Sequence, residues 1–267
     1  MEINRCYNEN CLETMNKIPD GYIDLTVTSP PYDNLRTYNG YSFNFEAVAK
    51  ELFRITKQGG VVVWVVSDAT IKGSETGTSF KQALYFKEVG FNLHDTMIYQ
   101  TNKPPQNNRR YEQDFEYMFI FSKYIPSVFN GILVDSLHPG VRHTGGHRKT
   151  TGELTVHTRK QDRTSALKLK GNIWYLPRSS KSGDVYSRMH PATFPDQLAE
   201  DHILSWSNEV DLVYDPFMGS GTTAKMAILN KRNWIGSEIS EEYCQIIERR
   251  ITTASTTQAP EGKGEKE

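Results

Sequence analysis

The sequence predicts an α/β protein, in which helices cover both faces of a doubly wound, largely parallel sheet. Segments with the two-residue period of strands alternate along the chain with segments whose apolar residues recur every three or four positions. The run from Val61 to Val66 is apolar throughout, which is typical of a strand buried on both faces of a parallel sheet. The 267 residues suffice for one large domain with a modest insertion.

The predicted elements follow from these periods and from turn residues. In the first strand, apolar Ile23, Leu25 and Val27 alternate with polar residues until two prolines end the ladder. We expect strands at 23–28, 61–66, 93–99, 116–121, 212–214 and 234–238, and helices at 45–56, 80–89, 193–206, 222–230 and 241–250. These elements place residues 1–253 in one main domain, and the apolar-poor segment 254–267 is expected to be a disordered tail.

The charge is unevenly distributed, although the formal net charge of the chain is only −1. Between Ser136 and His190 there are eleven Lys and Arg against three Asp and Glu, a local charge of +8 that leaves −9 for the rest. The regular alternation of elements also breaks down here, and we interpret 126–187 as an inserted basic region. Such asymmetry indicates a local surface for a polyanion, although a solvated basic loop would have the same composition.

The three cysteines, at positions 6, 11 and 244, lack the spacing of a zinc site or a disulfide framework. The N-terminal residues lack the apolar core of a signal peptide, and the longest apolar run is too short to cross a bilayer. We therefore expect a cytoplasmic protein. The histidines near Gly145-Gly146-His147 are irregularly spaced, so they predict solvated polar residues rather than a metal site.

A glycine-rich turn is predicted between the strand at 212–214 and the helix at 222–230. Its residues are Asp215, Pro216, Phe217, Met218, Gly219, Ser220, Gly221, Thr222 and Thr223. The glycines let backbone approach a ligand closely, and the helix start presents free N–H groups to an anion. No Lys precedes Thr222 and no third Gly follows, so the turn matches neither a P-loop nor the full dinucleotide fingerprint.

An acidic residue, Glu238, ends the next predicted strand. Its distance from the turn suits a carboxylate that accepts hydrogen bonds from ribose hydroxyls. A nucleoside with an amino-acid tail satisfies both ends of this site, and S-adenosylmethionine is such a molecule. A glycine-rich connection beside a surface Glu is the alternative interpretation.

A second candidate site, Ser29-Pro30-Pro31-Tyr32, follows the first strand. Ligands bind beyond the carboxyl ends of strands in sheets of this kind. The prolines leave carbonyls without matching N–H donors, so a carbonyl and the Ser29 hydroxyl can accept both N–H bonds of an exocyclic amine. Tyr32 offers a ring on which a flipped base can stack. Taken alone, the run could equally be a Pro-Pro strand stop.

The chain resembles the amino-methylating DNA methyltransferases, in the permuted group whose catalytic motif precedes its cofactor motif. Thr28-Ser29-Pro30-Pro31-Tyr32 matches the catalytic motif in its Ser form, and Asp215 to Thr223 matches the cofactor motif. The segment from His190 to Pro195 resembles the one that flanks the methionine end of the cofactor. This resemblance adds Asn10, Cys11, Pro191 and Thr193 to the cofactor-binding residues, with Asn10 standing where the family often has Asp.

The resemblance implies a Rossmann-like methyltransferase sheet whose insertion, 126–187, is the target-recognition region for double-stranded DNA. It implies that the exocyclic nitrogen of a flipped base attacks the methyl group of S-adenosylmethionine, with both N–H groups held by Ser29 and the Pro30 carbonyl. The Ser form favours cytosine N4 over adenine N6, although Ser, Asp and Asn can all accept from an amine. Methylation of a cytosine ring carbon is rejected, because no cysteine has the Pro-Cys context of that reaction.

Arginines in the basic region are the candidate DNA contacts: Arg142, Arg148, Arg159 and Arg163. The family also leaves a homodimer and a cognate restriction endonuclease open as partners. Two other functions stay open, a non-catalytic DNA-binding module that keeps the fold and a methyltransferase acting on RNA or a protein amide.

Overall fold

The computed structural model describes residues 1–31, 44–102, 109–136, 146–148, 151, 154–156, 166–176 and 195–258. These residues form two compact units. The larger unit joins Met1–Asn130 to Asn172–Glu267, and the smaller is Gly131–Gly171. The predicted site residues whose side chains are described all belong to the larger unit.

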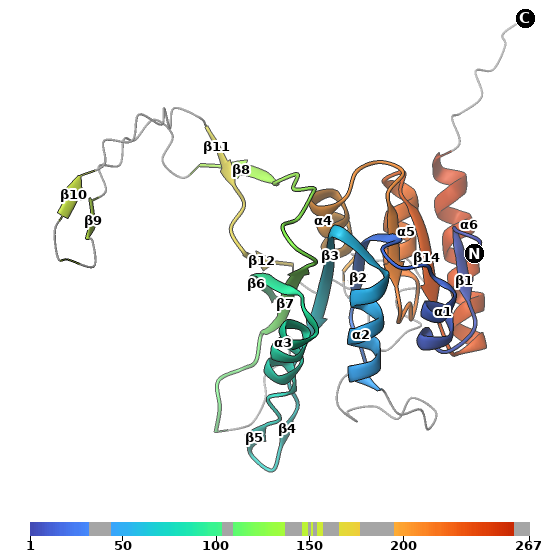
Figure 1. Ribbon diagram of the computed structural model, residues 1–267, viewed down its shortest axis with the longest axis horizontal. Helices are drawn as coiled ribbons and strands as arrows, with labels where there is room; N and C mark the ends of the chain where they lie inside the picture. The colour runs from blue at the N-terminus through green and yellow to red at the C-terminus, as the bar shows by residue number, and fades with distance from the viewer. Residues whose placement is uncertain are drawn as a thin grey trace, which may run out of the picture. The chain divides into compact units, whose positions relative to one another are not determined.

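The larger unit is built on an eight-stranded sheet (Figure 1). In spatial order the strands are β1 (Arg5–Tyr7), β14 (Asn233–Ser237), β13 (Leu212–Asp215), β2 (Ile23–Thr28), β3 (Thr56–Val66), β7 (Phe115–Ser122), β6 (Asn92–Gln100) and β12 (Ile173–Tyr175). β7 is antiparallel to both β3 and β6, while the other neighbouring pairs are parallel. The sheet is therefore mixed, with one reversed strand.

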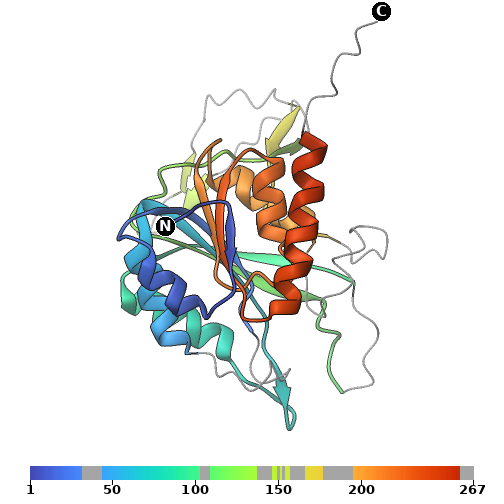
Figure 2. The same ribbon diagram turned by 90° about the vertical axis from the view of Figure 1, so that its right-hand side faces the viewer.

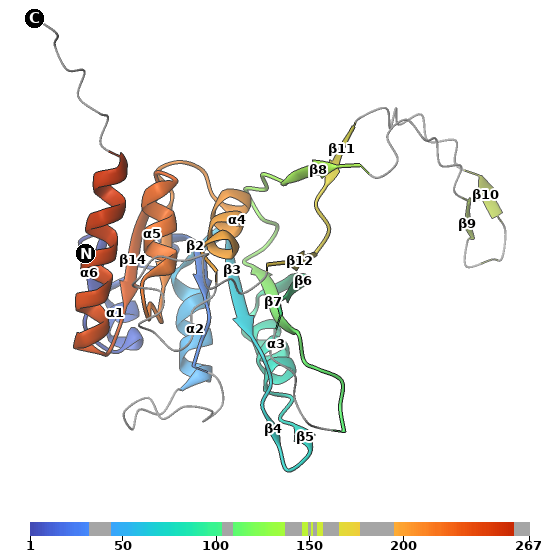
Figure 3. The same ribbon diagram turned by 180° about the vertical axis from the view of Figure 1, so that it is seen from behind.

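Helices cover both faces of this sheet, as the sequence predicts for a doubly wound fold (Figure 2). One face carries α1 (Cys11–Lys17), α2 (Phe45–Ile55) and α3 (Thr78–Val89). The opposite face carries α4 (Asp196–Trp206), α5 (Thr222–Leu229) and α6 (Glu241–Gln258), with α5 and α6 side by side (Figure 3). The run from Val61 to Val66 is buried at every position, which confirms a strand covered on both sides.

Strand β3 begins earlier than its apolar run predicts. It starts at Thr56, immediately after α2, and passes through Gly59 and Gly60, a pair of residues that is typical of turns. Gly59 has φ +78°, and a Cβ there would lie 2.8 Å from the Ser127 Cβ. The register with β2 shifts between Ile23 and Leu25, so the glycines form an irregular start to the strand instead of a loop.

Two short elements near the N-terminus were not predicted. β1 has three residues and α1 has seven, too few for either periodicity to emerge. At the other end, α6 continues to Gln258, so the first five residues of the expected tail, 254–258, are helical, and 259–267 lie outside the described residues. Helix α4 begins at Asp196 after Pro195 as its N-cap, and the predicted start at Thr193 is not among the described positions.

The predicted insertion, 126–187, is divided between the two units. In the smaller unit, β8 (Leu133–Asp135) pairs with β11 (Leu167–Leu169), and β9 (Gly146–Arg148) pairs with β10 (Leu154–Val156). The stretch expected to be irregular thus contains two short antiparallel ladders. In contrast, β12 adds an edge strand to the main sheet by pairing in parallel with β6, so this part of the range belongs to the larger unit. A further hairpin joins β4 (Thr70–Ile71) to β5 (Ser74–Glu75).

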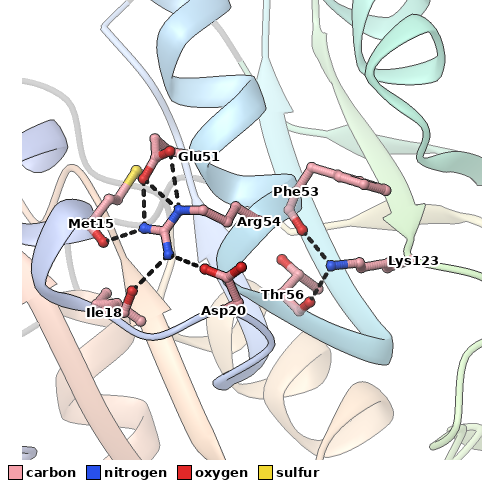
Figure 4. Close-up of polar contacts among 8 residues, drawn as sticks. All are labelled: Met15, Ile18, Asp20, Glu51, Phe53, Arg54, Thr56 and Lys123. Carbon is pink, nitrogen blue, oxygen red and sulfur yellow. Dashed lines mark hydrogen bonds and ion pairs between the residues drawn. The ribbon is translucent and has the colours of Figure 1, made fainter.

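Two cations satisfy backbone carbonyls where α1 and α2 end (Figure 4). Arg54 donates to the carbonyls of Met15 at 2.7 Å and Ile18 at 2.9 Å, and its guanidinium pairs with Glu51 and Asp20. These anions raise the pKa of Arg54 above its ordinary value. Lys123 donates to the carbonyls of Phe53 at 2.7 Å and Thr56 at 3.0 Å. Both side chains supply partners that the last turn of a helix cannot provide for itself.

Replacing Arg54 with Met should lower the free energy of unfolding by about 2 kcal/mol, because the α1 carbonyls lose charged donors and Glu51 loses its partner. Urea denaturation measures this change. Lys231→Met is the control, since the Lys231–Glu209 pair is exposed and should contribute less than about 0.5 kcal/mol. Equal losses in the two variants would contradict the role given to Arg54.

Candidate functional site

The two predicted site segments meet at one edge of the sheet. Thr28 and Asp215 end the neighbouring parallel strands β2 and β13, and the Thr28 hydroxyl donates to the Asp215 carboxylate at 2.7 Å. From the start of α5, the Thr223 hydroxyl donates to the Val27 carbonyl at 3.1 Å. The segment after β2 and the segment after β13 are therefore joined by side-chain hydrogen bonds, at the carboxyl ends of strands where such sheets bind ligands.

The turn from Asp215 to Thr223 has the backbone geometry that its glycines predict. Gly219 and Gly221 have φ +51° and φ +79°, values that favour glycine. The Gly221 N–H closes the turn on the Met218 carbonyl at 2.7 Å. Gly221 is also the N-cap of α5 and supplies no side-chain acceptor. The first N–H groups of α5 therefore lack a side-chain cap, as an anion-binding helix start requires.

Gly236 of β14 lets this turn pack closely against the sheet. A Cβ at position 236 would lie 1.9 Å from the Met218 sulfur, an impossible contact. The Met218 N–H also donates to the Ser237 carbonyl at 3.0 Å. The position of the turn is thus set by the strand that leads to Glu238.

Glu238 follows β14 and is tied directly to the turn. One carboxylate oxygen accepts from the Gly219 N–H at 2.8 Å, and the other accepts from the Ser240 N–H at 2.9 Å. The side chain is buried, which raises the pKa of Glu238, and the two N–H donors act against that rise. A carboxylate has about four acceptor positions, so these two bonds leave capacity for ligand hydroxyls.

The predicted catalytic run begins immediately beyond β2. Ser29 and Pro31 are half-buried and Pro30 is buried, so the run lies partly under the surface at the edge where the cofactor turn begins. Tyr32 is outside the described residues, and its stacking role stays a prediction.

The structure gives Asn10 and Cys11 local structural contacts. Asn10 is the N-cap of α1, and its side-chain oxygen accepts from the Leu12 N–H at 2.9 Å. Cys11 is buried, which raises its pKa to about 12. A nearby residue that the sequence did not single out, Asn8, donates to the Glu238 carbonyl at 2.9 Å. The segment after β1 therefore lies beside Glu238, and the adenine contact of Asn10 and Cys11 stays a prediction.

Several predicted residues lie outside the part of the chain that the structure describes. These are Pro191 and Thr193 of the cofactor site, and Arg142, Arg159 and Arg163 of the DNA interface. Arg148 lies in β9, but its side chain is not among those described. Within the described ranges, no group of three or more His, Cys, Asp and Glu could hold a metal ion. None of the described helices combines the length and apolarity needed to cross a bilayer.

Sequence reasoning missed an ionic cluster at the turn, in which Arg250 is buried and Asp196 and Lys225 are half-buried. Arg250 of α6 contacts Ser220 and Thr222, and it shares Asp196 with Lys225. The signal was present in the sequence, because Arg250 stands on the same helical stripe as Ile246 and Ile247. A cation on an apolar stripe indicates a buried partner.

The environment of Asp215 predicts a pH-dependent stability. Burial raises the pKa of Asp215 from 3.8 to about 6, although hydrogen bonds from Thr28 and Phe217 favour the ionised form. A raised pKa gives stability that is fully present below about pH 4 and is lost as pH rises through about 6, by about 3 kcal/mol in all.

Asp215→Asn should remove this dependence. The unfolding free energy of the wild type, measured in urea from about pH 4.5 to 7, should therefore fall relative to that of the variant. The subtraction cancels groups that titrate in both proteins. If the unfolding free energies of the wild type and the variant changed in parallel with pH, the raised pKa given to Asp215 would be contradicted.

Two solved structures that share this fold are described as DNA methyltransferases or methylases. The PvuII DNA methyltransferase, described as cytosine-N4-specific, superimposes with a TM-score of 0.69 at 22% identity, over 94% of this chain and 90% of that one. A Thermus thermophilus protein described as a DNA modification methylase, solved with S-adenosyl-L-methionine, gives a TM-score of 0.62 at 23% identity over 94% of this chain and 95% of that one. The fold is the Rossmann-like α/β fold of methyltransferases.

Sequence comparisons agree with this class. A family model described as DNA methylase, of the N6/N4 group, matches residues 23–249. The orphan methyltransferase M.BamHII of Bacillus amyloliquefaciens is 59% identical over 243 residues, which are 88% of this chain and 90% of that protein. The DNA adenine methyltransferase YhdJ of Escherichia coli is 29% identical over 94% of this chain and 84% of its own. The chain belongs to the N6/N4 family of DNA methylases.

Proposed function

We propose that this protein transfers the methyl group of S-adenosylmethionine to the exocyclic amine of a flipped DNA base, with cytosine N4 favoured and adenine N6 as the alternative. The observation that carries the proposal is the hydrogen bond between Thr28 and Asp215. It joins the last residue before the amine-binding run to the first residue of the cofactor turn. A methyl donor and a target amine bound at these two segments would be neighbours, as direct transfer requires.

The residues around the turn fit S-adenosylmethionine in chemical type. Glu238 has spare acceptor capacity for ribose hydroxyls, and the uncapped start of α5 suits the carboxylate of the amino-acid tail. Ionised Asp215 and Glu238 suit a cationic ligand, because opposite charges attract strongly in a buried site. We assign Pro216 and Phe217 to the same ligand, since they belong to the turn.

In the proposed reaction, Ser29 and the Pro30 carbonyl accept the two N–H bonds of the target amine. The nitrogen lone pair is otherwise delocalised into the base, and this geometry favours a tetrahedral nitrogen whose pair is free to attack. S-adenosylmethionine, when bound, would supply the methyl group: the nitrogen–carbon bond would form as the carbon–sulfur bond breaks, which leaves a neutral thioether. The methylated nitrogen then releases one proton to solvent. Tyr32 is assigned to stacking on the flipped base.

Cytosine N4 is favoured by the Ser form of the catalytic run. The relatives include proteins of both kinds, since YhdJ is described as an adenine methyltransferase and the PvuII enzyme as cytosine-N4-specific. The order of the motifs, with the catalytic run before the cofactor turn, supports the permuted group. The basic region with Arg142, Arg148, Arg159 and Arg163 is proposed to read DNA.

Direct detection of modified bases tests the proposal. DNA from a host that expresses the protein is sequenced with detection of both N4-methylcytosine and N6-methyladenine, and a host that expresses Ser29→Ala is the matched control. We expect N4-methylcytosine at one sequence motif in the host that expresses the wild type, and none in the host that expresses Ser29→Ala. Detection of N6-methyladenine instead would identify adenine N6, the alternative, as the methylated position. The proposed function would be refuted if the host DNA carried neither modified base and if purified protein with labelled S-adenosylmethionine also failed to label duplex DNA.

Substrate comparisons separate the other functions. Labelling of RNA but not duplex DNA would indicate an RNA methyltransferase, and DNA binding without affinity for S-adenosylmethionine would indicate a non-catalytic module. The homodimer and the cognate endonuclease stay predictions. The 59%-identical relative is named an orphan methyltransferase, and others, such as M.BamHI of the same species, are named Type II methyltransferases.

A further inference from the structure

Arg250 lies in α6, far in sequence from both predicted site segments, yet its side chain is only 1% exposed. A buried guanidinium is very unfavourable unless charged and polar groups surround it. The identity of its partners therefore indicates why the fold keeps a cation at this position.

The partners of Arg250 belong to the cofactor turn and to the start of α4. One terminal nitrogen, Nη1, donates to the Ser220 carbonyl at 3.0 Å, to the Ser220 hydroxyl at 3.1 Å and to the Thr222 hydroxyl at 2.8 Å. The other, Nη2, donates to one carboxylate oxygen of Asp196 at 2.8 Å. Lys225 donates to the second oxygen of Asp196 at 2.7 Å.

These contacts fix the part of the turn that is least determined by its own sequence. Ser220 lies between two glycines in the left-handed region, where the unbound chain has the most conformational freedom. Arg250 holds the carbonyl and the hydroxyl of Ser220 together with the hydroxyl of Thr222, the first residue of α5. The guanidinium thus sets the angle at which the start of α5 follows the turn.

Arg250 also links the turn to the segment that the sequence assigned to the methionine end of the cofactor. Asp196 directly follows Pro195, the last residue of that segment and the N-cap of α4. The local charge is positive, because Arg250 and Lys225 share the single carboxylate of Asp196. A net positive charge behind a helix start strengthens its attraction for an anion.

We propose that Arg250 is a positioning residue for the amino-acid end of S-adenosylmethionine. It holds the turn in its binding conformation, and its charge favours the ligand carboxylate. This inference rests on the proposed binding of S-adenosylmethionine at the turn. It assigns Arg250 no contact with the target base.

The test compares two ligands, S-adenosylmethionine and 5′-methylthioadenosine. The second lacks the amino-acid tail, and its sulfur is a neutral thioether where S-adenosylmethionine has a sulfonium. For Arg250→Met we expect Kd for S-adenosylmethionine to rise roughly 10- to 100-fold, the range of one to two charge-assisted hydrogen bonds, by calorimetry. Kd for 5′-methylthioadenosine should change by less than about threefold, and kcat at saturating S-adenosylmethionine by a similarly small factor.

Arg250→Lys keeps the charge but loses the planar fork, so its Kd for S-adenosylmethionine should lie between those of the wild type and Arg250→Met. This variant also carries the test if Arg250→Met does not fold. Arg54→Met is the matched control, since Arg54 is another heavily bonded arginine whose contacts are with α1 and α2. The Arg54→Met variant should unfold at lower urea concentration than the wild type and should bind S-adenosylmethionine and 5′-methylthioadenosine with unchanged Kd.

Two results would overturn the proposal. Equal weakening of both ligands by Arg250→Met and Arg250→Lys would mean that Arg250 acts on the fold in general. Unchanged affinity for S-adenosylmethionine would mean that the turn needs no such support. A wild type that binds neither ligand would instead refute the proposed function, so the two failures are distinguishable.

Discussion

Ser29→Ala is expected to lower kcat for DNA methylation by about 100-fold, while Kd for S-adenosylmethionine stays within about threefold of the wild type. The hydroxyl is proposed to accept an N–H of the target amine, and this bond strengthens as the nitrogen becomes tetrahedral. Its loss therefore raises the barrier to transfer and leaves the methyl donor bound. Single-turnover methylation of duplex DNA measures the first quantity, and calorimetry the second.

Ser74→Ala is the control for this substitution, because Ser74 lies in the β4–β5 hairpin and is exposed. It should methylate DNA at the wild-type rate. If Ser29→Ala retained full turnover, the hydroxyl would have no part in holding the amine. If it weakened the cofactor instead, Ser29 would belong to the other half of the site.

Glu238→Gln should raise Kd for S-adenosylmethionine by about 10- to 30-fold, with little effect on kcat once the cofactor saturates. The amide keeps the shape of the carboxylate but removes its charge and replaces one acceptor oxygen with a donor. That oxygen is bonded either to the Gly219 N–H or to the Ser240 N–H, so the substitution should both loosen the turn and remove the proposed ribose partner. Fluorescence or calorimetric titration gives the affinity.

Glu209→Gln provides the comparison, since Glu209 is exposed and pairs with Lys231 at the surface. The Glu209→Gln variant should bind S-adenosylmethionine with the Kd of the wild type. An unaltered Kd in Glu238→Gln would remove the ribose role and leave Glu238 as a structural partner of the turn.

The strands that carry the site were predictable because their patterns are local. β2 was expected at 23–28 and is found at Ile23–Thr28. The alternation of apolar and polar residues marks its two faces, and the two prolines mark its end. β13 extends one residue beyond the expected 212–214, to Asp215. The left-handed glycines of the turn were predictable for the same reason, as few other residues adopt that backbone.

Strand direction was not predictable, because a period of two is the same in parallel and antiparallel strands. No residue pattern indicated that β7 is reversed between β3 and β6. Likewise, Gly59 and Gly60 have the composition of a turn, yet they form the start of a strand and exchange backbone hydrogen bonds with Lys123 and Ser127. Tertiary contacts decided both cases.

The supporting residues of the site were missed for a related reason. Arg250 meets Ser220 and Asp196 across 30 and 54 residues of sequence, and no spacing rule connects such positions. Motifs identify residues that approach a ligand through a local turn. The residues that hold those turns come from other elements, so the fold is needed to identify which turn each of them contacts.

The order of strands in the sheet also has a consequence for synthesis on the ribosome. β1 pairs with β14, and β2 borders β13, so these N-terminal strands border partners located at 212–237. At a translation rate of about 5–20 residues per second, roughly 10 to 40 seconds separate the first strands from these partners. During that interval the apolar edge of β2 has no partner strand on this side and is open to association with other chains. We therefore expect the nascent protein to depend on chaperones until its last third has emerged. We also expect that the segment after β2 meets the turn after β13 late in folding.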